Sequence, residues 1–368
     1  MKVDYSYLGQ QFKDPSLILE DIRKLVLRGD FTLGAEVAAF EKKFIEFSGT
    51  RFATGVNSGA DALILIFRAL GIGPGDEVIT APNSFIASAG TIAMAGAKPV
   101  FADVGDDYNI DPAKLEAAIT KKTKALLPVH LTGCPADMEA ICEIGKRHNI
   151  PVVEDAAQAI GGAINGKPVG SWGIAAEFSL HPLKNLNVWG DGGMVSTDSE
   201  ELTEKVRLLR NHGLINRDEA VIFGTNSRLD TLQAVVGLHV IKDLHAVNDT
   251  RIRHAAFYDE GLSGLAPDVI LPPRRANIRQ VYHTYVIQAR DRDALKDFML
   301  QKGVDVKVHY PLPLHLHRCS RDLGYKEGDF PITEAQARSI LTLPVHQAMT
   351  MEQLEYVVEQ IRAFYKRR

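Results

Sequence analysis

The 368-residue sequence has little of several features that would mark a particular class of protein. Its 42 Lys and Arg do not outnumber its 46 Asp and Glu, so it has no basic excess for nucleic acid or an anionic membrane. Its three cysteines form no C-x-x-C pair, which argues against a disulfide framework and a cysteine-rich zinc site. No H-E-x-x-H motif occurs, and we predict no metal site.

Long apolar runs are also missing. No stretch approaches the ~20 apolar residues of a membrane-spanning helix, and the segment Met1 to Tyr7 lacks the apolar core of a secretory signal. We therefore expect a cytoplasmic protein. The composition, 45% hydrophobic and 24% charged residues, is that of an ordinary folded chain, and the length favours two domains over one.

Short β-branched runs alternate with helical patterns over the first part of the chain. This rhythm predicts a mostly parallel sheet covered by helices on both faces. The expected strands are Glu77–Ala81, Pro99–Val104, Ala125–His130, Pro151–Asp155, Glu177–Leu180 and Met194–Thr197. The expected helices are Ser58–Leu70, Ser84–Ala95, Pro112–Ile119 and Asp137–His148.

A smaller α+β unit is expected after this region. Its predicted elements are helix Asp249–Leu262, strand His283–Ala289, helix Arg292–Lys302, strand Asp305–His309 and helix Met351–Tyr365. The predicted domains are therefore 1–245 and 246–368.

Two glycine patterns resemble nucleotide-binding motifs but lack their context. Gly161 and Gly166-Lys167 are followed by Pro168 where a P-loop needs Ser or Thr, so we expect a hairpin instead. The run that begins at Gly71 follows a helix where a dinucleotide-binding motif would open one, so it predicts a helix end and a turn.

Three other groups carry chemistry. They are Asn57-Ser58-Gly59 at a helix start, Glu154-Asp155-Ala-Ala-Gln158 at a strand end, and Phe178-Ser-Leu-His-Pro-Leu-Lys184-Asn before Gly190-Asp-Gly-Gly. Each has an ordinary structural explanation when taken alone: Ser58 and Asp155 could cap helices, and Lys184 could be a solvated surface lysine.

Together these groups meet the needs of pyridoxal phosphate (PLP). This cofactor requires a lysine for a Schiff base, a carboxylate for its ring nitrogen, an anion site for its phosphate and a surface on which its ring stacks. The helix start at Ser58 offers N–H groups for the phosphate. Phe85 can stack, Asp155 can pair with the ring nitrogen, and Lys184 can bind the cofactor.

The same motifs resemble a known family over nearly the whole chain. Phe31-Thr-Leu-Gly, the run from Gly71 to Ile79, Val129-His-Leu-Thr-Gly, Glu154 to Gln158, Phe178 to Leu186, Gly190-Asp-Gly-Gly and His212-Gly are similar to the DegT/DnrJ/EryC1/StrS sugar aminotransferases. These are PLP enzymes of fold type I. The resemblance implies a large domain with a mostly parallel sheet flanked by helices, and a smaller C-terminal α+β domain.

The resemblance also implies roles for individual residues. Lys184 aligns with the catalytic lysine, Asp155 with the ring-nitrogen partner and Gln158 with a glutamine near the ring hydroxyl. Ser179 aligns with a phosphate contact. The expected phosphate-binding turn is Ser58, Gly59 and Ala60, where the family usually has Ser-Gly-Thr. Asn226 resembles an asparagine that reaches the phosphate from a neighbouring subunit, which implies a homodimer with shared active sites.

The expected reaction is transfer of an amino group from an amino acid, L-glutamate, to a nucleotide-linked keto-sugar. Lys184 would act as general base and acid. Gly190-Asp-Gly-Gly is most like the branch that acts on 3-keto sugars, so a 3-keto-6-deoxyhexose is expected. Candidates for sugar contacts are His181, Arg228, His309, Tyr310 and His315. The alternatives are a 4-keto sugar or cyclitol ketone as substrate, or a non-catalytic PLP-binding regulatory protein.

Overall fold

The computed structural model describes residues 1–366 and is built around a seven-stranded sheet. Two hydrogen-bonded sheets, β3-β2-β4 and β1-β9-β8-β5, are joined by parallel bridges from Leu126 to Val152 and from Val129 to Asp155. The strands are β1 (Phe52–Val56), β2 (Glu77–Thr80), β3 (Lys98–Phe101), β4 (Thr123–Leu127), β5 (Val153–Asp155), β8 (Ala175–Ser179) and β9 (Gly193–Thr197).

Strand direction confirms a mostly parallel sheet. Strand β9 is antiparallel to both β1 and β8, whereas β5 and β8 are parallel, as are β2, β3 and β4. The carboxyl ends of β1, β5 and β8 therefore meet at one edge of the sheet, where Ser58, Asp155 and Ser179 are found.

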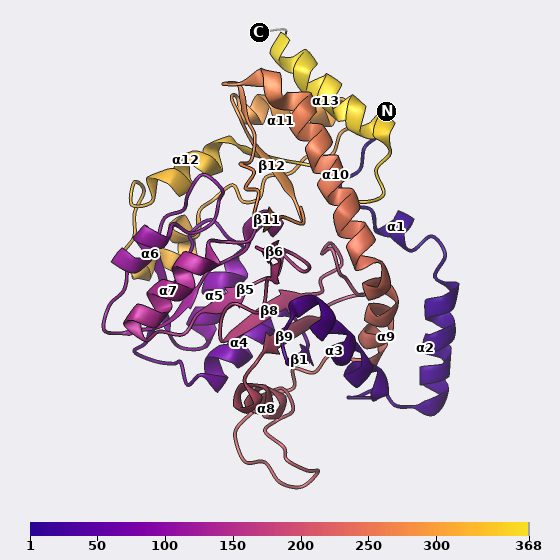
Figure 1. Cartoon of the computed structure of the whole chain (residues 1–368), viewed down its shortest axis with the longest axis vertical. Helices are drawn as coiled ribbons and strands as arrows, with labels where there is room; N and C mark the ends of the chain where they lie inside the picture. The colour runs from indigo at the N-terminus through magenta and orange to yellow at the C-terminus, as the bar shows by residue number, and fades with distance from the viewer. Residues whose placement is uncertain (367–368) are drawn as a thin grey trace.

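Helices cover both faces of the sheet (Figure 1). Apolar side chains of α4 and α8 pack on one face around Leu65, and those of α3 and α9 pack on the other around Phe44. The helices of this region are α3 (Ala35–Ser48), α4 (Gly59–Ala69), α5 (Ile86–Met94), α6 (Pro112–Ala117), α7 (Met138–His148), α8 (Glu200–Leu209) and α9 (Thr231–Val240).

A second, three-stranded sheet organises the C-terminal part, at the top of Figure 1. Its strands are β10 (Val269–Ile270), β12 (Tyr285–Ala289) and β13 (Ile340–Leu343), and its helices are α10 (Leu244–Leu262), α11 (Arg292–Gln301), α12 (Pro331–Ser339) and α13 (Met351–Lys366). Val3 is buried in this C-terminal core, so the start of the chain crosses to it. The boundary after residue 245 stays a prediction.

The remaining elements are short or peripheral. They are α1 (Leu8–Gln11), α2 (Ser16–Arg28), β6 (Ala163–Ile164), β7 (Lys167–Pro168), β11 (Ile278–Arg279) and the 3-10 helices Leu131–Gly133, Ile241–Asp243, Ser263–Leu265, Leu314–Leu316 and Arg318–Leu323. The β6–β7 pair confirms the hairpin expected around Gly166. Among the described helices, none combines the length and apolar character needed to cross a bilayer.

The strand expected at Asp305–His309 is wrong. In the structure Val304 forms a bridge with Val3, and Lys307 forms one with Thr342. Because this segment passes from one partner to another, it pairs through single residues and no continuous ladder develops.

Candidate active site

A cavity of about 450 Å³ lies at the carboxyl edge of the large sheet, and the C-terminal unit and the start of the chain complete its walls. Most of the predicted site residues line it. They are Ser58, Gly59, Ala60, Phe85, Asp155, Gln158, Ser179, His181, Lys184, His309 and Tyr310.

The start of α4 forms an anion-binding turn. Ser58 caps the helix, and its hydroxyl accepts the N–H of Asp61 at 3.1 Å. The first N–H groups of a helix have no intrahelical acceptor, so those of Gly59 and Ala60 remain for a ligand. An added Cβ at Gly59 would lie 3.0 Å from Cβ of Ser179, so glycine is what lets α4 approach β8 this closely.

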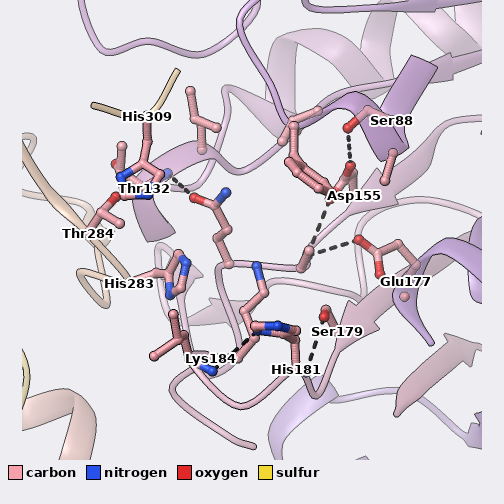
Figure 2. Close-up of a pocket in the computed structure, with 18 of the residues that line it drawn as sticks. Ser88, Thr132, Asp155, Glu177, Ser179, His181, Lys184, His283, Thr284 and His309 are labelled. Atoms are coloured by element: carbon pink, nitrogen blue, oxygen red, sulfur yellow. Dashed lines mark hydrogen bonds between the residues drawn. The ribbon is translucent and has the colours of Figure 1, made fainter. Parts of the chain in front are cut away.

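Lys184 is held at its backbone and directs its amine into the cavity (Figure 2). Its N–H donates to the carbonyl of His181 at 2.8 Å. Its carbonyl accepts from Oη of Tyr7 at 3.0 Å and from Nδ2 of Asn187 at 3.1 Å. Burial lowers the pKa of Lys184, while the carboxyl groups of Glu177 and Asp155 oppose that shift. A neutral amine is the form that can accept a proton or bond a carbonyl carbon.

Asp155 ends β5, and a hydrogen bond holds its carboxylate. Its Oδ2 accepts the hydroxyl of Ser88 at 2.6 Å. The preceding residue, Glu154, points to the opposite face of the strand, where it accepts N–H groups of Gly170, Trp172 and Gly173 at 2.8–2.9 Å. The carboxylate of Asp155 is thereby presented to the cavity in a defined orientation.

Four histidines surround the cavity, and all are shifted toward the neutral form. Burial lowers the pKa of His309 and of His346 to about 4, and that of His283 well below its usual value. Burial also lowers the pKa of His181, and the charge of Lys184 adds to the effect. These rings can therefore donate or accept hydrogen bonds without adding charge at neutral pH.

Gln158 and two aromatic side chains define the other wall. Oε1 of Gln158 accepts the N–H of Thr132 at 2.7 Å. Burial raises the pKa of Tyr310 to about 12, so this phenol stays protonated at neutral pH. Phe85 is 54% exposed, and its ring centroid lies 5.7 Å from that of Tyr310. An exposed ring beside a cavity can stack on a planar ligand.

Three predicted residues do not line this cavity in the described chain. Asn226 is exposed and forms a β-bridge with Asn211. Arg228 donates to Oδ1 of Asn211 at 2.8 Å. His315 is buried, and its Nε2 lies 3.1 Å from Oε1 of Glu334. Asn226 and Arg228 would therefore have to act in the active site of another chain. The predicted contact of His315 with the sugar stays a prediction.

The cavity also contains residues that sequence reasoning missed. They include Tyr7, Ser88, Glu177, Arg251 and His283. Ser88 lies within a predicted helix and Glu177 within a predicted strand. The local sequence pattern therefore predicts secondary structure at these two residues but no functional role. The others come from segments far from the motifs, and pattern spacing cannot bring those segments together.

The chemistry of the cavity fits a phosphorylated, planar, electrophilic cofactor. It brings together N–H groups for an anion, an enclosed amine, a carboxylate and an exposed aromatic ring, as PLP requires. Gly59 lets this helix start pack against β8, since a Cβ there would lie 2.7 Å from Oε2 of Glu177.

Comparison with known proteins agrees with this reading. A model of the DegT/DnrJ/EryC1/StrS aminotransferase family matches residues 14–362. The chain is 44% identical to the pleiotropic regulatory protein of Geobacillus stearothermophilus, over 100% of this chain and 99% of that one. It is 41% identical to dTDP-3-amino-3,4,6-trideoxy-alpha-D-glucose transaminase of Streptomyces venezuelae, over 94% of this chain and 91% of that one.

A solved structure extends the similarity to the whole fold. DesV from S. venezuelae, crystallised in complex with a ketimine intermediate, superposes with a TM-score of 0.96. The two chains are 39% identical, and the match covers 99% of this chain and 98% of that one.

Proposed function

Because the chain belongs to the DegT/DnrJ/EryC1/StrS aminotransferase family, we propose that it transfers an amino group from L-glutamate to carbon 3 of a nucleotide-linked keto-sugar. It is a PLP-dependent sugar aminotransferase. One observation carries the assignment: the amine of Lys184, the carboxylate of Asp155 and the N-terminus of α4 open into the same cavity.

These residues have distinct tasks in the reaction. PLP supplies a carbonyl carbon that bonds amines and a ring that delocalises negative charge. Gly59, Ala60 and Ser179 would bind its phosphate, and Asp155 would hold its ring nitrogen in the protonated form. Lys184, with its lowered pKa, would accept a proton at Nζ and return it, as a general base and then a general acid.

The relatives and the motif support a 3-keto sugar as the substrate. The S. venezuelae relative is named for a 3-amino sugar carried on dTDP, which supports amination at carbon 3 of a 6-deoxyhexose. Gly190-Asp-Gly-Gly supports the same branch. The 4-keto sugar and the cyclitol ketone are the competing substrates. A substrate panel separates them: 3-keto and 4-keto sugars linked to the same nucleotide, and cyclitol ketones.

A regulatory role without catalysis is the other candidate, since one relative is called a pleiotropic regulatory protein. Lys184 in the cavity argues for catalysis. The test is the absorption of the purified, PLP-loaded protein. Glutamate should bleach the visible band of the wild type and should not bleach that of Lys184→Ala, which should be inactive. Full activity of Lys184→Ala would exclude the proposed role.

A homodimer with shared active sites is also proposed. Large apolar side chains are exposed on α2 and on the segment that follows α8, which extends away from the body in Figure 1. Phe223 on that segment is 94% exposed, and Asn226 lies close to it in sequence. Exposed apolar surface of this kind is typical of protein–protein interfaces, which supports the proposed dimer. The three cysteines are free, which suits the reducing cytoplasm, where we place the enzyme.

Subunit mixing tests the shared site. Asn226→Asp would place a negative charge beside the cofactor phosphate and should abolish activity, as should Lys184→Ala. Mixed dimers of the two variants contain one intact site, so unfolding and refolding them together should restore activity. No recovery, with mixed dimers present, would show that Asn226 acts within its own chain.

A further inference from the structure

A second carboxyl group, that of Glu177, lies beside Asp155 in the wall of the active-site cavity. Strands β5 and β8 run parallel with Asp155 paired to Glu177 in register. Side chains alternate along a strand, so Glu177 and Ser179 face the same side, toward α4 and the cavity. Figure 2 shows Glu177 between Asp155 and Ser179, opposite Lys184.

The two carboxyl groups receive unequal hydrogen bonding. Asp155 accepts the Ser88 hydroxyl at 2.6 Å and, at 3.4 Å, the N–H of Ala157. Glu177 accepts only that same N–H of Ala157, at 3.1 Å to its Oε1. Its Oε2 is buried and takes no hydrogen bond from the residues 1–366. Donors stabilise the charged form of a carboxyl group, so Asp155 is the one that keeps the charge.

The charges around Glu177 do not stabilise a second negative charge beside that of Asp155. Burial and the negative charge of Asp155 raise the pKa of Glu177 well above its usual value, and the positive charge of Lys184 only opposes this. Two acids of neighbouring elements are bonded elsewhere: Glu154 accepts backbone N–H groups on the opposite face of β5, and Asp61 of α4 accepts the hydroxyl of Ser227 at 2.9 Å. Asp191 also lines the cavity, and its carboxyl group cannot compensate a second anion. Strand β9 contributes no ionisable side chain.

Glu177 also touches the turn assigned to the phosphate. A Cβ at Gly59 would lie 2.7 Å from Oε2 of Glu177, so this oxygen lies directly against the start of α4. An ionised Glu177 would therefore place a negative charge between Asp155 and a bound phosphate, and would repel the phosphate in a poorly hydrated site.

We propose that Glu177 is a neutral carboxylic acid in the holoenzyme, that the Asp155–Glu177 pair carries a single negative charge, and that tight binding of PLP requires the proton on Glu177. This proposal rests on the proposed function. Glu177 is a positioning residue here: it acts through Asp155 and through the start of α4. Cofactor binding is then linked to one proton, and PLP must dissociate more readily when Glu177 ionises.

Equilibrium binding of PLP between pH 6 and 10 tests the linkage. A required proton makes the dissociation constant rise about tenfold per pH unit once the pKa of free-enzyme Glu177 is passed. The wild type should therefore show a slope of log Kd against pH about one greater than that of Glu177→Gln, which mimics the neutral acid. Near pH 6 the two proteins should bind PLP within about threefold of each other.

Controls separate this effect from other titrations. Lys184 and the cofactor are present in both proteins, so their ionisation contributes to both slopes and cancels from the difference. Glu334→Gln removes another buried carboxyl group, one that lies in α12 away from the cavity, and should keep the wild-type slope. If Glu177→Gln does not fold, Glu177→Ala replaces it and should lose the same dependence.

Two results would overturn the proposal. One is equal slopes in the wild type and Glu177→Gln. The other is tighter binding by Glu177→Gln already at pH 6, which would show an ionised Glu177 in the wild type. Both leave PLP bound to Lys184 and the proposed function intact. Failure of the proposed function would instead appear as a wild type that does not bind PLP at all.

Discussion

Gly59→Ala should weaken cofactor binding because the helix start and strand β8 are packed without room for a methyl group. The new Cβ would lie 2.7 Å from Oε2 of Glu177, 3.0 Å from Cβ of Ser179 and 3.2 Å from its Cα. Glu177 is 2% exposed and Cα of Ser179 belongs to a sheet strand, so neither can move aside easily. The strain must instead shift the first turn of α4, whose N–H groups bind the phosphate.

The size of the effect follows from overpacking. Extra methyl groups in a packed site cost about 1–3 kcal/mol. If the shifted turn takes all of this strain, the Kd for PLP should rise about fivefold to about 150-fold, since 1.4 kcal/mol is a factor of ten. Absorbance titration of the apoprotein with PLP measures it directly.

A matched substitution distinguishes local strain from a general effect of Gly→Ala. Gly90 also lies in a helix, α5, but no described atom beyond its own helix and neighbours is within 4 Å of its added Cβ. Gly90→Ala should keep the wild-type Kd and raise stability by up to ~1 kcal/mol through helix propensity. Wild-type PLP affinity in Gly59→Ala would refute the close packing of α4 on β8.

Two further substitutions test the supports of the site. Tyr7→Phe removes the hydroxyl that donates to the Lys184 carbonyl at 3.0 Å, and should cost ~1 kcal/mol in urea unfolding while Asn187 still holds that carbonyl. Glu154→Gln replaces an acceptor-only group with one that also donates, leaving at least one of three backbone N–H groups unpaired. It should cost ~1–3 kcal/mol, and an unchanged free energy of unfolding would contradict the assigned hydrogen bonds.

The alternation of short β-branched runs and helices was sufficient to predict the central strands of the large sheet. Strand β1 lacks this pattern and is not among the predicted strands. Its sequence, Phe-Ala-Thr-Gly-Val, contains small and flexible residues, and it is stabilised by pairing with β9, far later in the chain. The segment Asp305–His309 has the pattern but forms no strand. Its apolar residues alternate, but its neighbours offer only single bridging partners.

The residues of the site also divide into those that the sequence could predict and those that it could not. Ser58 and Asp155 stand at the ends of predicted elements and Lys184 follows a predicted strand, and parallel strands bring such ends together, so their meeting could be predicted. Their individual roles came from family resemblance. Glu177 could not be found, because only the register of β8 against β5 places it beside Asp155. Tyr7 could not be found either, since the start of the chain carries no motif.

The balance of charge in the cavity explains why the residue at position 177 must be neutral. Arg251 brings a positive charge to the walls, burial lowers the pKa of Lys184, and Asp155 and Asp191 are acids that line the cavity besides Glu177. His309 and His346, with pKa values of about 4, add none at neutral pH. Without a surplus of positive charge, the cavity must bind a phosphate through the N–H groups of α4 and the Ser179 hydroxyl. An ionised Glu177 would add a further negative charge next to that phosphate, so the anion is retained while Glu177 keeps its proton.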